Sequence, residues 1–441
     1  MQWWRKISRK SRQFHDTLQS FQSAYAKWEL ENSTFILTRC WKVLLAMLLP
    51  VILFMGVEAA LATELIGGGK AYAPSFITTE MFIGSLFVGL IAGLITGCIG
   101  AGGGFVITPA LMSIGVRGIM TVGTDQFHIF AKAIMGTALH RKLGNVNVWL
   151  AVWFVVGSTL GVTLGTGLNK SIYEKSPALS DAFISAVYVF MLGILGAYAL
   201  YDYLSLRRAE ASQKAQVQTT TRVARTLQSL KIPPYVKFDQ DVVPGGRQLP
   251  VYPVILCGFI VGFIAAIMGV GGGFLTFPMF VYGLGVSTFT TVGTDILQII
   301  FTAGYASIQY AISGFVFYSL TMGLLLGSLV GVQIGAMVTK VVKGAVIRGF
   351  YALAIFAGFV NRACALPEKL SSAGYLSLAP AAGKLLSTIG TVIFFALVSG
   401  FAFWVLASFL RSVGKIRAEH AALAGVPAAS GRTEQALEST H

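Results

Sequence analysis

Charged residues are scarce in this chain. Only 12% of its 441 residues are charged, while 55% are hydrophobic, whereas about 25% of the residues in an ordinary soluble domain are charged. This composition excludes a soluble globular protein and indicates an integral membrane protein, whose surroundings are the lipid bilayer.

Cysteines and catalytic motifs are also rare. The four cysteines, Cys40, Cys98, Cys257 and Cys364, form no CxxC pair, and each lies in or beside an apolar run. They are therefore predicted to be small apolar core residues and neither disulfides nor metal ligands. The sequence contains no HExxH, no paired zinc ligands, no serine–histidine constellation and no GK[ST] phosphate loop. We expect no enzyme, no metal site, no cofactor and no ATP-driven step.

Acidic residues are outnumbered, at 18 against 33 basic ones, which gives a net charge of +15. The basic residues crowd the first 40 positions and the polar stretch at about 204–250. No aromatic-interleaved or recognition motif accompanies them, so a nucleic-acid partner is not expected. Basic residues collect on the cytoplasmic side of membrane proteins, and both regions are therefore assigned to the cytoplasm.

Glycine is abundant, and its pattern occurs twice. The stretch GAGGGFVITP, Gly100 to Pro109, returns as GVGGGFLTFP, Gly269 to Pro278, and TVGTD at Thr121 to Asp125 returns at Thr291 to Asp295. The offset is 169 residues at the prolines and 170 at the last threonines of TVGTD. The same register then pairs Gly144 with Gly314, Gly157-Ser158 with Gly327-Ser328, and Gly165 with Gly335. The chain is thus a duplicated unit.

The apolar segments predict how each copy crosses the membrane. Ten long segments, each near the ~20 residues that a spanning helix needs, lie at about 41–62, 79–99, 121–141, 146–168, 182–203, 251–270, 288–312, 315–339, 345–361 and 385–410. Two short ones lie at 105–117 and 274–286. If the short ones also cross, the basic clusters all fall on the cytoplasmic side and each copy crosses five times. Because five is odd, the second copy enters the membrane upside down.

The predicted fold is therefore an all-α polytopic helical bundle of two inverted-topology repeats with flanking helices, an architecture typical of secondary transporters. Its parts are a cytosolic basic segment 1–40, a first transmembrane helix 41–62, repeat 79–203, a cytosolic linker 204–250 with one short helix around 211–230, repeat 251–361, a last transmembrane helix 385–410 and a cytosolic tail 411–441. The Ala-Leu-Ala ending at residue 62 resembles a signal-peptidase site, so cleavage there stays open.

The two glycine runs interrupt apolar sequence at what should be membrane depth. Irregular backbone is tolerated there only when it is buried in protein or lines a polar cavity. Gly102, Gly103 and Gly104, with Gly271, Gly272 and Gly273, could therefore form turns whose free N–H groups, together with the positive end of the following helix, suit an anion. The alternative is that the glycines only allow close helix packing. Pro109 and Pro278 should kink or end the short segments.

The pairs Thr124-Asp125 and Thr294-Asp295 each precede a long apolar stretch. One interpretation is a threonine N-cap with an acidic residue in the first helical turn. The other is that the aspartates titrate or bind a cation during transport, because carboxylates inside membrane helices are costly and usually functional. A carboxylate would repel an anion, so Asp125 and Asp295 are better candidates for ion coupling than for substrate binding.

The copies differ on the helix that follows. The first copy carries His128, Lys132 and His140, where the second has Gln298, Thr302 and Tyr310. Asp125, His128 and Lys132 share one helical face. Either Lys132 supplies positive charge to an anion path, or it forms a structural ion pair with Asp125. The candidate substrate-binding residues are Gly102, Gly103, Gly104, Thr124, Lys132, Gly271, Gly272, Gly273 and Thr294, and the candidate ion-coupling residues are Asp125, His128 and Asp295.

The doubled GxGGGFxxxP motif, followed each time by a VGTD helix, resembles the sulfite exporter TauE/SafE family of bacterial membrane transporters. The resemblance covers roughly 79–361 and carries over the motif glycines, Pro109, Pro278 and the Thr-Asp pairs. It implies the family's helical membrane fold and small sulfur-containing anions such as sulfite, organosulfonates or sulfoacetate as substrates. The long basic N-terminal extension and the long linker depart from the family pattern. Substrate and direction vary within the family, so neither is carried over.

The sequence thus predicts a secondary transporter that moves a small oxyanion across the bacterial inner membrane by alternating access, with both chain ends in the cytoplasm. A passive anion channel is the alternative. An intramembrane enzyme using His128 or Cys98 and a membrane sensor that signals through the linker are weaker ones. The sequence leaves a homo-oligomer open.

Overall fold

The computed structural model describes residues 79–99, 103–142, 146–211, 221–230, 232–239, 246–338, 342 and 344–424. The expected segments 1–40 and 41–62, the end of the tail and Gly102 lie outside these ranges. Met47–Ser408 forms one compact unit, which contains every helix and strand discussed below up to Ser408 of the last helix.

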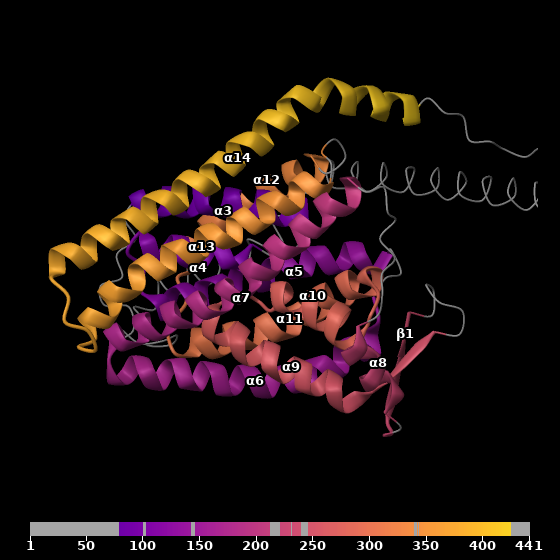
Figure 1. Cartoon of the computed structure of the whole chain (residues 1–441), viewed down its shortest axis with the longest axis horizontal. Coiled ribbons are helices and arrows are strands. Elements are labelled where there is room, and N and C mark those ends of the chain that lie inside the picture. Colours follow the sequence, from indigo (N-terminus) through magenta and orange to yellow (C-terminus); the bar gives the residue numbers. More distant parts are fainter. Residues whose placement is uncertain are drawn as a thin grey trace, which may run out of the picture. The chain divides into compact units, whose positions relative to one another are not determined.

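Each apolar segment of the two copies becomes a helix (Figure 1). The first copy comprises α3 (Thr79–Ile99), α4 (Gly104–Ser113), α5 (Gly118–Lys142), α6 (Val148–Lys175) and α7 (Pro177–Ala211). The second comprises α9 (Val251–Met268), α10 (Gly273–Pro278) with the π-helix η1 (Met279–Leu284), α11 (Thr288–Ile312), α12 (Tyr318–Val338) and α13 (Gly344–Ser372); α14 (Pro380–Ala424) follows. The predicted all-α polytopic class is confirmed.

Seven of the helices in the described ranges are long and apolar enough to cross a membrane, namely α3, α6, α7, α9, α12, α13 and α14. The two short segments also form helices, although Pro109 lies inside α4 while Pro278 ends α10 and a π-helix takes over. Helices α5 and α11, at two of the ten expected apolar segments, are not among the seven, although each has 25 residues, about 37 Å of helix and enough to cross a membrane. The expectation that they cross stays a prediction.

The first and fourth helices of the two copies exchange partners. Helix α3 packs along α12, and α6 packs along α9. A Cβ at Gly89 of α3 would lie 2.3 Å from the Leu324 carbonyl oxygen, and a Cβ at its counterpart Gly258 would lie 2.1 Å from the Phe154 carbonyl oxygen. Such distances leave no room for a side chain, so small residues make both contacts, as they do in membrane helix pairs.

The third and fifth helices instead pair with their own counterparts, α5 with α11 and α7 with α13. A ring carbon of Phe130 lies 2.9 Å from where Gly304 would carry a Cβ, and a Cβ at Gly123, earlier in α5, would lie 3.0 Å from the Cβ of Tyr310, later in α11, so the two helices run in opposite directions. A two-fold axis between the copies would produce this whole pattern of partners. The orientation of the copies relative to a membrane stays a prediction.

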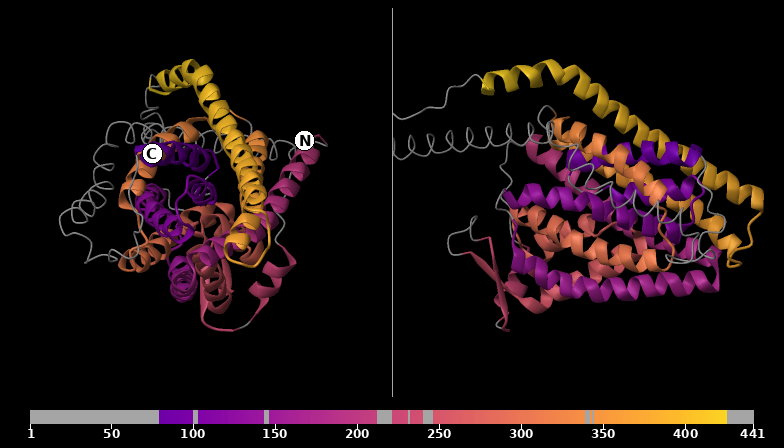
Figure 2. Two further views of the ribbon diagram at one scale, coloured as in Figure 1. Left: turned by 90° about the vertical axis from the view of Figure 1, so that its left-hand side faces the viewer. Right: turned by 180° about the vertical axis from the view of Figure 1, so that it is seen from behind.

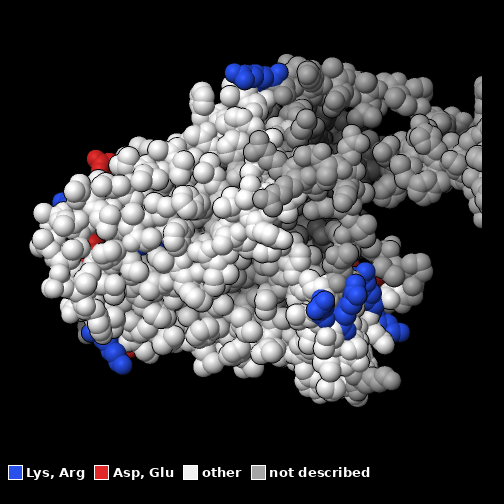
Figure 3. All heavy atoms as spheres, viewed as in Figure 1, with Lys and Arg blue, Asp and Glu red and all other residues white. Residues whose placement is uncertain are grey.

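The linker contains more structure than the sequence indicated. Helix α8 (Arg222–Ser229) is followed by strands β1 (Tyr235–Phe238) and β2 (Arg247–Pro250), which pair antiparallel beside the ends of α6 and α9 (Figure 2). The hairpin was not predicted, although the exposed and buried residues of β1 alternate, as in a half-buried strand. The basic side chains of this region gather on one face of the molecule that is otherwise nearly free of charge (Figure 3).

The linker is bonded to the second copy. Arg247 Nη1 donates to the Gly285 carbonyl oxygen at 2.7 Å, and Gln228 Nε2 donates to the Leu284 carbonyl oxygen at 2.8 Å. Asp239 accepts from the backbone N–H of Ser287, the N-cap of α11, at 2.9 Å and lies 3.7 Å from Arg247 Nη1. The C-terminal end of η1 therefore receives donors from outside the bundle.

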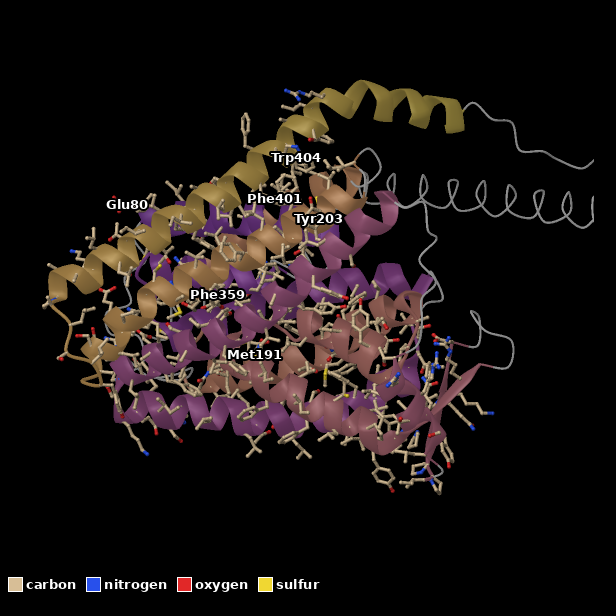
Figure 4. All side chains as sticks on the ribbon, in the orientation of Figure 1. Glu80, Met191, Tyr203, Phe359, Phe401 and Trp404 are labelled. Carbon is tan, nitrogen blue, oxygen red and sulfur yellow. The ribbon has the colours of Figure 1, made fainter. Side chains whose placement is uncertain are left out.

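Helix α14 lies along α13 through small and aromatic residues (Figure 4). The Phe350 ring is 4.3 Å from the Trp404 ring and 5.3 Å from the Phe401 ring. A Cβ at Gly390 would lie 2.5 Å from the Cβ of Cys364. Residues before Ser408 thus attach α14 to the second copy along much of α13.

Candidate functional site

Glycines in the left-handed region start both short helices. Gly103 has φ 68° and caps α4, and Gly272 has φ 87° and caps α10. A side chain would be strained there, and a Cβ at Gly103 would lie 2.7 Å from the Ala92 carbonyl oxygen. The first N–H groups of a helix have no partner within it, so each turn aims backbone donors and the positive end of a helix at the bundle interior.

The two turns meet at the boundary between the copies. A Cβ at Gly104 would lie 3.0 Å from the Cα of Val270, and a Cβ at Gly271 would lie 2.5 Å from a side-chain carbon of Ile129. The Phe105 and Phe274 rings, which occupy equivalent positions of the repeated motif, are 5.9 Å apart. The sequence motif therefore defines one composite region of the fold.

The two aspartates lie against these turns. Asp125 Oδ2 is 3.2 Å from where Gly104 would carry a Cβ, and Asp295 Oδ2 is 3.2 Å from the same point at Gly273. Asp125 is completely buried and Asp295 is 7% exposed. Each carboxylate thus lies near the positive end of a short helix, where a negative charge is favoured.

The first copy surrounds its aspartate with ionisable groups. Thr108 Oγ1 donates to Asp125 Oδ2 at 3.4 Å, and His128 Nδ1 lies 3.5 Å from Asp125 Oδ1. The other ring nitrogen of His128 is 2.9 Å from Ser328 Oγ of the second copy. Lys132 follows on the same face of α5, about two turns beyond Asp125. On the predicted face, Asp125 and His128 are buried and Lys132 is partly buried, and His128 joins the face to the second copy.

Lys132 also reaches the glycine turn of the first copy. Its ammonium donates to Thr96 Oγ1 at 3.2 Å, and the same hydroxyl is 2.9 Å from where Gly103 would carry a Cβ. A fixed positive charge thus lies beside free backbone donors, an arrangement that suits a small anion. Thr96 was not among the predicted site residues, because a threonine inside an apolar helix carries no sequence signal of its own.

The second copy surrounds its aspartate with neutral groups. Gln298 Nε2 donates to Asp295 Oδ1 at 2.8 Å and to Thr276 Oγ1 at 3.4 Å. Thr302 Oγ1 donates to Gln298 Oε1 at 2.8 Å, and Ser158 Oγ of the first copy lies 2.8 Å from Thr302 Oγ1. A continuous chain of hydroxyl, amide and carboxylate oxygens replaces the histidine and lysine.

The interpretation of Thr124 and Thr294 as N-caps of their own helices is wrong. Helix α5 begins at Gly118 and α11 at Thr288, six residues earlier in each case, because residues before TVGTD also take helical conformation. Thr124 Oγ1 instead accepts from the Phe317 N–H and Thr294 Oγ1 from the Asn147 N–H, both at 3.0 Å. Each threonine thus serves the start of the fourth helix of the other copy. Their expected contact with substrate stays a prediction.

A second buried cation, Arg362, was missed. It is 2% exposed and comes from α13, directly after the expected end of the last repeat helix. Its guanidinium donates to the Pro109 carbonyl oxygen at 3.3 Å and to Ser113 Oγ at 3.0 Å, both in α4. Because a cation at a helix C-terminus is favourable, Arg362 stabilises the position of the short helix that carries the first glycine turn. An arginine inside an apolar helix was the available signal.

The family model for the sulfite exporter TauE/SafE matches residues 85–361, which include both glycine turns, both aspartates and the side chains around them, while Arg362 follows directly after the match. The chain belongs to this family. Similar curated proteins are the probable membrane transporter proteins YjnA and YunE of Bacillus subtilis and MJ0441 of Methanocaldococcus jannaschii.

YjnA is 25% identical over 58% of this chain and 89% of its own length. YunE is 26% identical over 59% of this chain and 89% of its own length, and MJ0441 is 23% identical over 52% and 78%. No solved structure matches the chain significantly. This family member is a multi-pass membrane transporter, and the names of its relatives point to transport and not to an enzymatic reaction.

Proposed function

We propose that this TauE/SafE transporter is a secondary carrier of small sulfur-containing oxyanions such as sulfite, organosulfonates or sulfoacetate in the bacterial inner membrane. The proposal rests on one observation above all. The Lys132 ammonium lies beside the Gly103 turn, joined to it by the Thr96 hydroxyl, so a charge and backbone donors converge at the boundary between the copies.

The arrangement suits an oxyanion for a physical reason. Tetrahedral and pyramidal sulfur oxyanions present several acceptor oxygens, and backbone N–H groups at a helix start bind such groups without adding a full counter-charge. Lys132 adds the charge, and because it is partly buried its attraction is screened less by salt than that of a surface lysine. Asp125 offsets Lys132 while no anion is bound, which keeps the site from being permanently charged.

The exchange of partners between the copies supports alternating access. The α3–α12 and α6–α9 contacts are equivalent, as are the two turns that meet between them. In an inverted repeat, each copy can adopt the conformation of the other, so the site opens to one side and then to the other. The anion site at the boundary of the copies would then stay in place while the helices around it move.

Flux through proteoliposomes tests the proposal. Purified protein should take up sulfite or sulfoacetate with saturation, and Lys132→Gln should lower the rate by about 100-fold, the size of effect seen when one strong donor is removed from a preorganised site. Gly103→Leu should abolish flux. Gly167→Leu is the matched control, because a Cβ at Gly167 meets no atom within 4 Å.

Two results would contradict the proposal. Flux that rises in proportion to concentration without saturation would make the protein a passive anion channel. Saturable flux that is the same in Lys132→Gln and in the unchanged protein would remove the anion site from the first glycine turn.

A further inference from the structure

The second copy holds a cluster of oxygen atoms around Asp295 that the anion site leaves unused. The cluster comes from three helices and from both copies, and its members are joined by hydrogen bonds of 2.8 to 3.4 Å. Its side chains are Thr276 of α10, Asp295, Gln298 and Thr302 of α11, and Ser158 of α6. All five are at least nine-tenths buried.

Asp295 lacks a compensating charge within the described part of the chain. It accepts a hydrogen bond from the neutral amide of Gln298, and none of the ion pairs between described residues includes it. A buried carboxylate without a counter-charge is costly and is stable only when it takes up a proton or a cation. The short helix near Asp295 offsets part of this cost but brings no full charge.

In the first copy, a side chain of the protein supplies a positive charge near the equivalent aspartate. Asp125 is equivalent to Asp295, and Lys132 brings an ammonium to the same face of α5. The residue equivalent to Lys132 is Thr302, a neutral oxygen ligand. Where the first copy contains a tethered ammonium, the second therefore has side-chain oxygen atoms but no cation of its own among the described residues.

We propose that a sodium ion binds at Asp295 and takes the part in the second copy that the Lys132 ammonium has in the first. Carboxylate, hydroxyl and amide oxygens are the ligands that hard cations prefer. Asp295 and Thr276 offer them directly, and Thr302 and Ser158 support the Gln298 amide from its other side. Half a turn of the Gln298 amide would present its oxygen to the ion in place of its NH2 group.

The proposed site deepens the proposed function, and its role in transport rests on that function. A sodium ion at Asp295 would add positive charge close to the boundary that an oxyanion must cross, so the two ions would favour each other's binding. Interrupted helices near the membrane centre bind coupling cations in other inverted-repeat transporters. Sodium binding itself can be measured without any anion.

The experiment follows the melting temperature of the purified full-length protein in detergent during titration with NaCl, against KCl and choline chloride at constant ionic strength. Because an ion that binds only the folded state stabilises it by mass action, NaCl should raise the melting temperature with saturation while KCl and choline chloride do not. Thr302→Lys, which adds an ammonium to the second copy, should remove the sodium response.

A second pair of variants covers a failure of Thr302→Lys to fold. Thr302→Val should raise the half-saturating sodium concentration by about 10-fold or more, the size of effect that loss of one supporting ligand has on metal affinity. Thr163→Val is the matched control, because Thr163 lies on the same α6–α11 contact but bonds to Tyr305, so its sodium response should be unchanged.

Several outcomes would overturn the inference. They are a melting temperature that responds to sodium no more than to choline, an unchanged sodium response in Thr302→Val, and a response to pH alone that Asp295→Asn abolishes, which would mean that Asp295 takes up a proton. The anion-flux assay fails or succeeds independently. Sodium binding without anion flux would contradict the proposed function and support the cation site. Anion flux without sodium binding would support the proposed function and contradict the cation site.

Discussion

The two copies have the same helix arrangement but different ionisable side chains around their aspartates. At equivalent positions the first carries Asp125, His128 and Lys132, and the second carries Asp295, Gln298 and Thr302. Both triads are buried except at the partly buried Lys132, lie against equivalent glycine turns and bond to an equivalent serine of the other copy, Ser328 or Ser158. Duplication therefore produced one scaffold with a fixed cation on one side of the boundary and neutral ligands on the other.

Different constraints act on the scaffold, which is the set of helix contacts between the copies, and on the site, which is the set of residues around the aspartates. The helix contacts must match in both copies, because each copy supplies half of each contact. The residues at the aspartates need not match, because each faces its own surroundings. Symmetric substitutions should therefore have equal effects in the scaffold and unequal effects at the site.

The largest expected effect is in the scaffold. Gly157→Val and its counterpart Gly327→Val should each destabilise the protein by about 3 kcal/mol or more, since overpacking at backbone contact forces helices apart. A Cβ would lie 1.9 Å from the Ile255 carbonyl oxygen in the first case and 2.0 Å from the Leu86 carbonyl oxygen in the second. Unfolding titrations in mixed micelles would measure both.

The control is Gly400→Val, because a Cβ at Gly400 meets no atom within 4 Å. An unchanged unfolding midpoint for Gly157→Val or Gly327→Val would mean that the copies do not pack as described. A large loss in one and none in the other would break the equivalence of the two contacts.

The next largest effect on stability should differ between substitutions of Asp125 and Asp295. Asp125→Asn should cost about 3 kcal/mol, because it removes the buried carboxylate that Thr108 and His128 contact and leaves the partly buried Lys132 charge without it, and the double variant Asp125→Asn/Lys132→Gln should recover part of this loss. In sodium-free buffer, Asp295→Asn should be neutral or stabilising, because it removes a buried carboxylate that has no basic partner in the described ranges. Equal losses for Asp125→Asn and Asp295→Asn would remove the distinction between the copies.

A smaller difference in unfolding free energy is expected between variants of the two arginines that bond to the ends of the short helices. Arg362→Gln should cost about 2 kcal/mol through its lost bonds to buried acceptors in α4. Arg247→Gln, at a partly exposed site on the linker, should cost about 1 kcal/mol or less. Unfolding midpoints would rank them, and a larger loss for Arg247→Gln would make the linker a main support of the bundle.

The smallest effects should again be equal. Thr124→Val and Thr294→Val each remove one hydrogen bond between the copies, and each should cost about 1 kcal/mol. Thr159→Val is the comparison, because its hydroxyl bonds only to the carbonyl oxygen of Val155 in its own helix. Losses that differ between Thr124→Val and Thr294→Val by as much as either loss itself would argue against reciprocal contacts.

The sequence was a good guide where a pattern repeats. The doubled glycine motif predicted both short helices and their glycine turns, and the register of the copies predicted which residues are equivalent. It could not predict that the turns meet, since Gly104 and Val270 are distant in sequence and only packing brings them together. Helices α5 and α11 were expected to cross the membrane; they are long enough to do so, and their crossing stays a prediction.

The sequence did not predict which single polar residues in apolar helices would lie at the site. Thr96, Ser158 and Ser328 belong to the two clusters, but membrane helices use such residues for packing as often as for binding. Arg362 was passed over because it follows the expected end of a segment. The role of Thr124 and Thr294 depended on where α5 and α11 begin, which is the least certain feature of any helix read from sequence.

The central claim is that the anion binds beside the lysine-bearing turn of the first copy. A cryo-electron microscopy map of the protein with saturating sulfoacetate in sodium buffer tests it most directly. Density for the anion between the Lys132 ammonium and the Gly103 turn, lost in Lys132→Gln, is the predicted result. Anion density at the Gly272 turn, or at neither turn, would contradict the account.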